Sequence, residues 1–573
     1  MSRQAPGSVW LSGLDAVARA MVIVAALAAV GFCTWGLDRA FEITDESYYV
    51  LLAMHPGSVK LYVSAQQWVT GLIWPLTGTL ALFRTAGLIL LVASAWVLAR
   101  GASAALALGS PGEPDTSLGR ALVIAASITG ALLYAATINL SPCYNLLASA
   151  GAYAAAGLVL LALHAQGSAK SHVLVLLAGF ALGVEFVSKP SAGIATLCLV
   201  SAWILVLGRP TWRGRVALVL TTASALAFCV LLLAVTQTTF TDVSFALDEG
   251  FDLFRMVQTE PVGARLSRYV SEFSRHSTEA FRSFAFAVVC VLAYLATRRL
   301  WVAAIAIAAL VYTYAASELY LGGVDRYATV TGSALVMFVL VLAVSWPAWW
   351  QQRKAVVIIA GLASLPYTVA VGTGNSIFTQ VIDSLAPWGA ALAAVVNLPF
   401  ERRNDKILAT MMLAVFVSGI CLQIVTSGFR APYHLHEPLF AQSRPVVIGR
   451  LGRVKVDAGT ATFVAALDAA ALECGIVRGT PFLGFYNAPG VALVLGGVPI
   501  LTPWLNNVAQ ADAVLRLAPP DRSKPRVVAI GLSPDGSTPE IPAALVSFPA
   551  EFKFCGEATY PFFEQRIQIW SAL

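Results

Sequence analysis

The sequence predicts an all-α polytopic membrane domain followed by a small extracytoplasmic α/β domain. The chain has 573 residues, of which 58% are hydrophobic and only 12% are charged, so too few polar residues are present to cover a water-soluble surface. Apolar runs long enough to cross a hydrocarbon core recur between Ala20 and Phe429, and helices satisfy their own backbone hydrogen bonds in lipid. After Arg430 the composition changes sharply, which marks the second domain.

The first apolar run, Ala20 to Leu37, is interpreted as a retained anchor. It lacks a small-residue cleavage pattern and lies behind Arg3 and Arg19, so it does not resemble a cleaved signal peptide. Basic residues before a first span favour the cytoplasmic side. We therefore expect the N-terminus to face the cytoplasm.

Basic residues occur in the short connections between apolar runs, and they predict the topology. These residues are Arg100, Arg120, Lys170, Arg209, Arg213, Arg215, Arg298, Arg299, Arg353, Lys354, Arg402, Arg403 and Lys406. The positive-inside rule assigns all of these loops to the cytoplasm. Because the charges are spread one loop at a time and form no basic face, no nucleic-acid partner is expected.

Two ambiguous stretches decide the number of spans. The stretch Leu61 to Leu80 contains Gln66, Gln67, Trp68, Trp74 and Pro75, a mixture typical of a helix that lies at the membrane interface. The stretch His172 to Leu207 is interrupted by Ser188-Lys189-Pro190, so it is interpreted as two short spans that meet at the outer surface. This arrangement predicts about thirteen spans and an external C-terminal domain.

Three segments are long enough to build external structure: 38–84, 236–281 and everything after Arg430. In the second, Leu247, Phe251 and Phe254 recur at helical spacing, which indicates amphipathic helices on the bilayer. The third alternates β-rich runs with helical patterns. The β-rich runs are Pro445–Val456, Pro481–Phe485, Val491–Leu495 and Arg526–Leu532, and the helical patterns are Thr460–Cys474 and Asn507–Leu517. The predicted domains are therefore 1–429 and 430–573.

Most of the eight cysteines lie in apolar runs, where a thiol behaves as a small hydrophobic group. Cys474 and Cys555 are alone in the C-terminal domain, and an oxidising compartment would favour a disulfide between them. The alternative is a pair of buried free thiols. No spacing resembles a zinc or haem-attachment site.

The residues that suggest chemistry follow the first span, in Phe41-Glu42-Ile43-Thr44-Asp45-Glu46-Ser47-Tyr48-Tyr49. Adjacent carboxylates above a membrane helix repel each other unless a cation or a proton meets them. By itself the pair also fits a solvated loop with ordinary acids. In this context, however, Asp45 to Tyr49 resembles the Asp-Glu-x-x-Tyr signature of the GT-C glycosyltransferases, polytopic enzymes that use lipid-phosphate-linked sugars.

Further stretches resemble the same superfamily in the same order. His55-Pro56 with Lys60 resembles a shortened form of the His-Pro-Pro and Lys element of protein O-mannosyltransferases. Phe83-Arg84-Thr85-Ala86-Gly87 resembles the Arg-Ala-Gly entry to the next span in bacterial lipid A aminoarabinose transferases. Phe186-Val187-Ser188-Lys189-Pro190 is similar to the Thr-Lys-Gly turn of those transferases, and Asp325-Arg326-Tyr327 is similar to their basic-Tyr element.

The sequence also departs from these families. The segment between Asp45 and Arg84 is much shorter, and Ser141-Pro142-Cys143-Tyr144-Asn145 stands where an Asp-Pro element is common. The C-terminal domain resembles no family that we can name. The resemblance therefore implies a donor class and a reaction type, and it leaves the acceptor open.

The resemblance implies an inverting transfer of a sugar from a polyprenyl phosphate to an extracytoplasmic glycan, lipid or protein. The transition state resembles that of glycoside hydrolysis, so a base must take the proton of the acceptor hydroxyl. Asp45 is the candidate base, and Glu46 would orient the acceptor or a cationic neighbour. No divalent metal cage is evident, so no cofactor is expected.

Cations should bind the phosphate, because they offset its charge before and during reaction. Lys189, Arg326 and Arg84 are the candidates, although an interface cation can also simply extend toward lipid headgroups. The other candidate contacts to phosphate, sugar or acceptor are His55, Lys60, Tyr49, Tyr144, Asn145, Glu318, Tyr320 and Tyr327. The arginines of the second external segment fit a solvated or lipid-facing surface better, and they are Arg255, Arg265, Arg268 and Arg275.

Two other classes of function fit a polytopic chain. A secondary transporter would keep ionisable residues near the membrane midplane and often shows corresponding halves with broken helices, whereas here the charges gather at the outer surface. A non-enzymatic envelope assembly protein would only present the C-terminal domain. We expect instead a GT-C glycosyltransferase of a bacterial-type inner membrane, with its active site facing the exterior.

Overall fold

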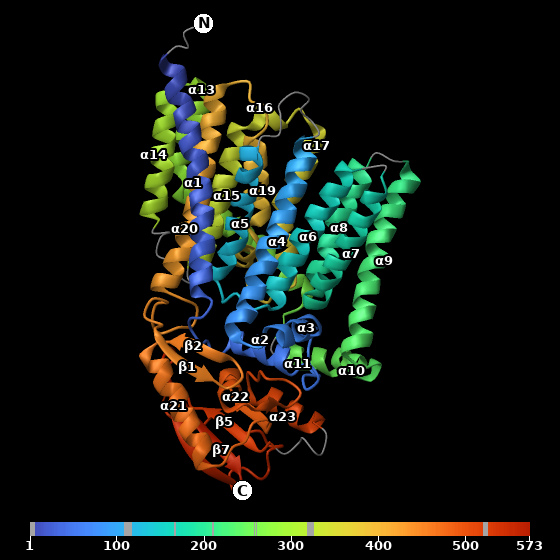
Figure 1. The fold of residues 1–573 in the computed structure, drawn as a ribbon, viewed down its shortest axis with the longest axis vertical. Helices are drawn as coiled ribbons and strands as arrows, with labels where there is room; N and C mark the ends of the chain where they lie inside the picture. The colour runs from blue at the N-terminus through green and yellow to red at the C-terminus, as the bar shows by residue number, and fades with distance from the viewer. Residues whose placement is uncertain are drawn as a thin grey trace.

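The computed structural model describes residues 6–107, 117–165, 168–208, 211–256, 258, 260–317, 326–486, 488–518, 525–533 and 535–573, with side chains from Gly13 onward. Long helices stand side by side in one bundle, and a sheet-containing domain lies beneath them (Figure 1). The first helix, α1 (Pro6–Gly36), begins at the end of the bundle remote from this domain, and the C-terminus lies within the domain. The predicted fold class is therefore confirmed.

The helices of the bundle follow the apolar runs of the sequence. They are α1 (Pro6–Gly36), α4 (Leu80–Ala107), α5 (Ser117–Leu132), α6 (Tyr144–His164), α7 (Ala169–Ser188), α8 (Pro190–Leu207), α9 (Trp212–Gln237), α13 (Ala285–Thr297), α14 (Leu300–Ala316), α15 (Tyr327–Val344), α17 (Arg353–Ala370), α19 (Ala386–Val396) and α20 (Arg403–Arg430). Short elements connect them: η1 (Leu133–Ala136), α16 (Trp346–Trp349), α18 (Ile377–Gln380) and η5 (Val381–Ser384).

The number of spans differs from the predicted thirteen. Within the described residues, ten helices are long and apolar enough to cross a membrane, and the total reaches twelve if each of two bent helix pairs forms one span. One further apolar helix, Leu300–Ala316, is shorter. The length criterion therefore does not confirm thirteen spans, although the chain is clearly a multi-pass membrane protein.

The break at Lys189 has the predicted form. Lys189 ends α7 and precedes α8 with φ −149° and ψ 88°, because a residue before proline is pushed out of the helical region. Pro190 then occupies the first turn of α8. A backbone N–H group at this position has no partner within the helix, so the absence of one in proline costs no hydrogen bond. The two helices thus meet at a turn near the C-terminal domain (Figure 1).

The surface and interior of the bundle are both those of a membrane protein. Only 22% of the most apolar stretch of helix α9 is buried inside the protein. The helix exposes large apolar side chains such as Phe228 and Val235. Inside, helices approach closely where residues are small. A Cβ on Gly157 of α6 would lie 2.5 Å from the carbonyl oxygen of Val97 on α4, so this crossing requires glycine.

A layer of short elements separates the bundle from the C-terminal domain (Figure 1). It contains α2 (Asp45–Met54), α3 (Gln67–Thr77), α10 (Phe240–Phe245), the π-helical turn η2 (Ala246–Gly250) and α11 (Phe251–Arg255), and the chain continues into α12 (Val262–Ser283). Helix α3 is too short to cross a membrane, as the interfacial prediction requires. The predicted helices around Leu247 and Phe251 also form.

The C-terminal domain contains a two-stranded hairpin and a five-stranded mixed sheet of order β4-β3-β5-β7-β6. The strands are β1 (Arg444–Ile448), β2 (Gly452–Val456), β3 (Pro481–Phe485), β4 (Val498–Pro499), β5 (Val527–Gly531), β6 (Phe552–Tyr560) and β7 (Gln565–Ala572), with helices α21 (Ala458–Glu473), α22 (Pro489–Leu495) and α23 (Val508–Leu517). Strands β4, β3 and β5 run parallel, and β7 pairs antiparallel with β5 and β6.

Two predictions for this domain have clear outcomes. Cys474 and Cys555 form a disulfide that joins the end of α21 to β6. The run Val491–Leu495, predicted as β-rich, is instead part of helix α22. Pro489 occupies the first turn of this helix and Gly496 ends it at φ 67°, and these start and stop residues outweigh the β propensity of valine.

The C-terminal domain and the loop after α1 share one hydrophobic core. Phe41, Ile43 and Leu51 pack in a buried cluster with Val491, Phe463 and other residues of the domain. The backbones also pair, because Gly490 N donates to the Ile43 oxygen at 2.8 Å. The helix that begins at Asp45 is therefore held between the two domains.

Cysteine labelling tests the topology. A cysteine introduced at Asp248 or Asp535 should react with a membrane-impermeant maleimide added outside the cell, and one at Arg402 should not. All three positions are exposed, so accessibility reports the side of the membrane. The parent should lack Cys198, which is exposed, and keep the disulfide pair. External labelling at Arg402 would overturn the assigned orientation.

Candidate active site

The site begins at the N-terminus of α2, where Glu42 caps the helix. The Glu42 carboxylate accepts hydrogen bonds from the backbone N–H groups of Thr44 (2.7 Å) and Glu46 (2.8 Å). These are N–H groups that have no partner within the helix, and the helix dipole favours a negative charge there. Glu42 is fully buried, so its role is structural and it fixes where the next residues point.

Glu46 forms a buried ion pair with Arg84 of α4. Arg84 Nε and Nη2 donate to the two carboxylate oxygens of Glu46 at 2.7 and 2.6 Å, and both side chains are 2% exposed. The remaining N–H groups of Arg84 donate to the carbonyl oxygens of Leu37, Arg39 and Ala40. Since all five N–H groups are used, Arg84 does not bind a phosphate in this arrangement.

The loop before α6 completes the surroundings of Glu46. Asn139 Nδ2 and Ser141 Oγ donate to the carboxylate at 2.8 and 2.6 Å. This loop lies so close to α4 that a Cβ on Gly87 would be 1.8 Å from the Leu140 oxygen. The lack of a side chain at Gly87 thus allows Ser141 to reach Glu46.

Asp45 faces away from this ion pair and is held by the chain after α20. Tyr433 Oη donates to Asp45 Oδ2 at 2.5 Å. The next residue, His434, stacks on Tyr433 with ring centroids 3.8 Å apart and contacts Thr44 Oγ1 through Nδ1 at 3.0 Å. His434 Nδ1 also lies 3.5 Å from Glu42 Oε1.

The surroundings of Asp45 raise its pKa to about 6. Burial is the main cause, and the negative charge of Glu42 adds to it, while the hydrogen bond from Tyr433 and the charge of His434 act in the opposite direction. A carboxylate with a pKa near neutrality is a better proton acceptor than an ordinary aspartate. Burial and the nearby Asp45 charge also raise the pKa of Tyr433, which keeps its hydroxyl proton available for donation.

Asp45 opens into a cavity of about 510 Å³ between the bundle and the C-terminal domain. Its membrane-side wall includes Tyr48, Tyr49, Gln66, Tyr144, Ser188 and Lys189, and its opposite wall includes Thr502, Trp504, Asn506 and Gln510. Tyr49 and Tyr144 pack edge to face at 5.9 Å, and Trp504 packs on Tyr48 at 5.4 Å. A carboxylate, an ammonium group and aromatic rings therefore share one space.

Lys189 reaches this cavity from the α7–α8 turn. Its ammonium group makes one long hydrogen bond, to Asn145 Oδ1 at 3.5 Å, and its side chain is mostly buried. Asp383 and Glu185 are the carboxylates whose charges act on it, but neither forms an ion pair with it. An ammonium group has three N–H donors, so Lys189 retains donors for an anion in the cavity.

His55 and Lys60 do not line this cavity. Lys60 Nζ pairs with Asp242 Oδ1 at 2.8 Å and so ties the segment after α2 to α10. His55 lines a separate cavity of about 250 Å³ beside Arg450 and Arg478. Burial and the charge of Arg450 lower the pKa of His55, so the ring favours its neutral form.

The predicted basic-Tyr element lies elsewhere in the bundle. Tyr327 Oη donates to the carbonyl oxygens of Thr137 (3.1 Å) and Ala136 (3.3 Å), which fixes the start of α15 against η1. Arg326 immediately precedes α15, and neither residue lines the main cavity. Glu318 and Tyr320 lie outside the described residues.

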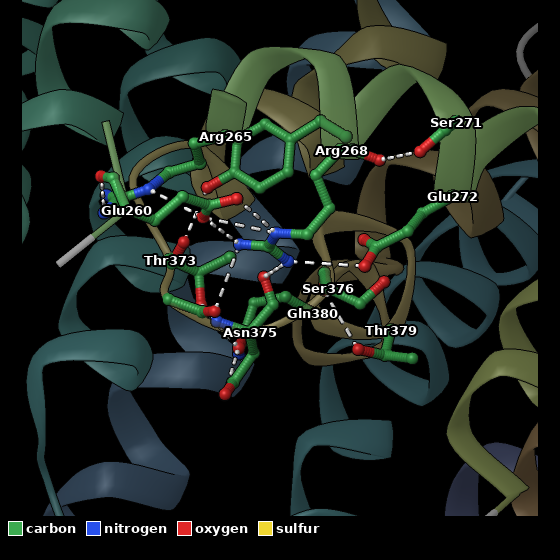
Figure 2. Close-up of polar contacts among 12 residues, drawn as sticks. Glu260, Arg265, Arg268, Ser271, Glu272, Thr373, Asn375, Ser376, Thr379 and Gln380 are labelled. Atoms are coloured by element: carbon green, nitrogen blue, oxygen red, sulfur yellow. Dashed lines mark hydrogen bonds and ion pairs between the residues drawn. The ribbon is translucent and has the colours of Figure 1, made fainter. Parts of the chain in front are cut away.

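The arginines of the second external segment are engaged in ion pairs and other polar contacts, and Figure 2 shows those of Arg265 and Arg268. Arg268 pairs with Glu260 at 3.0 Å and Glu272 at 3.3 Å, and it donates to the carbonyl oxygens of Gly374 and Asn375. Gly374 and Asn375 line the main cavity, so Arg268 supports the cavity wall indirectly. Arg265 shares Glu260. Arg255 pairs with Asp252, and Arg275 contacts His276.

Several site residues were not predicted from the sequence. Glu42 was within the quoted motif, and an acid at the start of a helix is a recognisable capping signal. No local signal identifies Tyr433 and His434, because Tyr433 is 388 positions from Asp45. The same holds for Asp383, whose carboxylate accepts from Thr137 at 2.8 Å, and for the wall formed by the C-terminal domain.

The structure is similar to two solved membrane enzymes. No protein-family model and no curated protein matches the chain. The oligosaccharyltransferase of Archaeoglobus fulgidus matches with a TM-score of 0.46 and 11% identity, over 94% of this chain and 79% of that one. ArnT from Cupriavidus metallidurans bound to undecaprenyl phosphate matches with a TM-score of 0.42 and 16% identity, over 96% of this chain and 97% of that one.

Both are GT-C glycosyltransferases. They belong to the superfamily that the motifs of this sequence resemble.

The environment of Glu46 predicts a loss of stability in Glu46→Gln. The substitution leaves the buried Arg84 without its counter-charge, and breaking a buried pair in this way costs about 3 kcal/mol. The apparent melting temperature of the purified protein should fall clearly. Glu557→Gln is the matched control, because Glu557 pairs with Arg566 at the surface and such pairs contribute little. Equal effects of the two substitutions would contradict the structural role of Glu46.

Proposed function

We propose that this protein is an inverting glycosyltransferase that moves a sugar from a polyprenyl phosphate to a hydroxyl of an extracytoplasmic acceptor. The observation that carries the proposal is that Asp45 and Lys189 line the same cavity. One provides a proton acceptor and the other an anion-binding group. The donor lipid is of the kind bound in the ArnT structure, and the membrane is a bacterial-type inner membrane with the cavity facing outward.

The reaction needs three groups in one space. The acceptor hydroxyl attacks the anomeric carbon of the sugar, its proton passes to Asp45, and the bond between that carbon and the phosphate oxygen breaks. The phosphate leaves on the polyprenyl chain with the electron pair of the broken bond. Lys189 offsets the charge that develops on it. Metal independence stays a prediction.

The positions of the two groups support this assignment of roles. Lys189 lies at the turn between two apolar helices, at the end of the bundle nearest the C-terminal domain (Figure 1), where a lipid phosphate would meet the protein. Asp45 lies on α2, between that end and the C-terminal domain. A lipid-borne donor entering from the membrane side and an acceptor entering from the outer side would therefore meet between them.

The alternatives fit these features less well. A transporter would use charges near the membrane midplane, whereas Asp45 and Lys189 lie at one end of the bundle. An assembly protein needs no carboxylate with a raised pKa next to an anion-binding cavity. Raised pKa values of this kind are typical of catalytic groups.

Asp45→Asn tests the proposed base. The amide keeps the size of the side chain and cannot accept the proton, so transfer should fall by roughly 10²–10⁴-fold. Donor lipid should still bind, because Lys189 is unchanged. The measurement is the cell-surface glycan or glycoprotein in a strain that lacks the native copy, normalised to protein abundance. Full modification by Asp45→Asn at normal abundance would contradict the assignment of the base.

The pH dependence of transfer should report the pKa of Asp45. Because the unprotonated carboxylate is the active form and its pKa is about 6, kcat/KM should be constant above that pH and fall about tenfold per unit below it. Tyr433→Phe removes a donor to the charged form. The acidic limb should then move up by about one pH unit, since a hydrogen bond to a charged group contributes about 1.5 kcal/mol.

The control for this experiment is Tyr486→Phe. Tyr486 Oη donates to the Glu540 carbonyl oxygen at 2.9 Å, away from Asp45, so its loss should leave the limb in place. The other groups that act on Asp45, Glu42, His434 and Tyr49, remain in both variants. The proposed environment of the base would be contradicted if the acidic limb of the pH profile lay in the pH range of an ordinary aspartate. It would also be contradicted if Tyr433→Phe did not shift that limb.

A further inference from the structure

Gln66 presents a buried acceptor atom without a donor beside the proposed phosphate site. The Gln66 side chain is 1% exposed, lines the main cavity, and its Oε1 atom is buried without a hydrogen-bond partner in the described structure. Buried polar atoms in folded proteins are almost always paired. Because Gln66 also lines the cavity, a donor group bound there would supply the hydrogen bond that its Oε1 atom lacks.

The position of Gln66 is fixed relative to Lys189. Ala65 N donates to the Val187 oxygen at 2.8 Å, and Ser64 Oγ donates to the Ser188 oxygen at 2.6 Å. These bonds attach the segment before Gln66 to the turn that carries Lys189. On the other side, Gln66 is the N-cap residue that immediately precedes α3, and its own backbone carbonyl oxygen accepts from the backbone N–H groups of Val69 and Thr70. The Gln66 side chain is thus presented from a rigid support.

The chemistry of the two side chains identifies what each can bind. An ammonium group only donates hydrogen bonds, so Lys189 suits a phosphate. A carbonyl oxygen only accepts, so Gln66 Oε1 needs a ligand that carries an O–H or N–H group. The phosphodiester and the polyprenyl chain of the donor carry neither, and the phosphate monoester of the bare lipid carries none when it is fully ionised, whereas a sugar carries several hydroxyls. A phosphate followed by a sugar is the order in which the proposed donor presents these groups.

We propose that Gln66 accepts a hydrogen bond from a hydroxyl of the donor sugar and so makes the site selective for a glycosylated lipid phosphate over the bare lipid. The proposal rests on the function proposed above and extends it to the substrate group that the cavity recognises. Gln66 is a specificity-determining residue in this scheme. Asp45 and Lys189 keep the roles proposed for them in the transfer reaction.

The neighbouring residue offers a matched control. Gln67 is also 1% exposed, and both polar atoms of its amide lack partners in the described structure, but it does not line the cavity. Leucine has nearly the volume of glutamine and removes the amide from either position. Gln66→Leu and Gln67→Leu therefore each remove a buried amide, but only Gln66 belongs to the cavity lining, and Gln66→Met provides a second apolar variant of the same length.

Binding to the full-length protein in lipid nanodiscs tests the proposal without an acceptor. The probes are undecaprenyl phosphate alone and the same lipid carrying glucose, galactose, mannose or N-acetylglucosamine. Wild-type protein should bind at least one glycosylated probe more tightly than the bare lipid. Gln66→Leu should lose about tenfold of that gain, the effect of one buried hydrogen bond, and should bind the bare lipid normally. Gln67→Leu should behave as wild type, and Lys189→Ala should weaken all probes.

The outcomes separate this proposal from the function on which it rests. If the bare lipid does not bind wild-type protein, or binds it independently of Lys189, the proposed function fails. If the bare lipid binds through Lys189 but no sugar improves binding, only the role of Gln66 fails. The role of Gln66 also fails if both Gln66→Leu and Gln66→Met still bind the glycosylated probe more tightly than the bare lipid by the wild-type factor. Melting temperatures within a few degrees of wild type establish that the variants are folded.

Discussion

The buried ion pair between Glu46 and Arg84 is the interaction on which the rest of the site depends. Burying two charges is tolerated only when their hydrogen-bonding groups are satisfied. Here all five N–H groups of Arg84 donate hydrogen bonds, either to Glu46 or to the carbonyl oxygens after α1. Asn139 and Ser141 donate the other two hydrogen bonds to the Glu46 carboxylate. The pair thus joins α2, α4, the end of α1 and the loop before α6 at one point. This junction fixes where α2 begins, and therefore where Asp45 points.

The same junction explains how two adjacent acids acquire different roles. Successive residues of a helix point about 100° apart, so one of them can face the bundle while the other faces the cavity. The Glu46 carboxylate accepts four hydrogen bonds, two from the Arg84 cation and one each from Asn139 and Ser141. Asp45 meets the Tyr433 hydroxyl, the charge of Glu42 and a partly desolvated space, so its pKa rises. Separate environments for a pair of carboxylates are a common way to divide catalytic and structural tasks.

The sequence predicted those features that depend on local pattern. The apolar runs predicted the helix bundle, and Lys189-Pro190 predicted the break between α7 and α8. The mixture of polar, aromatic and proline residues after Leu61 predicted an interfacial helix, and α3 is too short to span a membrane. The motif at Asp45 indicated the region of the candidate site. Arg84 was expected to bind a phosphate, but in the structure it is paired with Glu46, and a sequence does not reveal that a cation is already used by a nearby acid. Tyr433 and Gln66 show a second limit. Their roles depend on which distant or adjacent groups leave a polar atom paired or unpaired, and only the packed structure determines that.

The C-terminal domain is part of the site rather than an appendage of the bundle. The chain that leaves α20 passes Asp45 directly, where Tyr433 and His434 contact α2 and the residue before it, and Tyr560 of β6 then holds the His434 carbonyl oxygen at 2.9 Å. Ile43 packs in the core of the same domain. The contacts that dock the domain are thus the contacts that orient Asp45, and Trp504 closes the cavity from the opposite side. Asp45, the proposed base, therefore takes this position only when the domain is docked, so formation of the C-terminal wall of the cavity and positioning of Asp45 are one structural event.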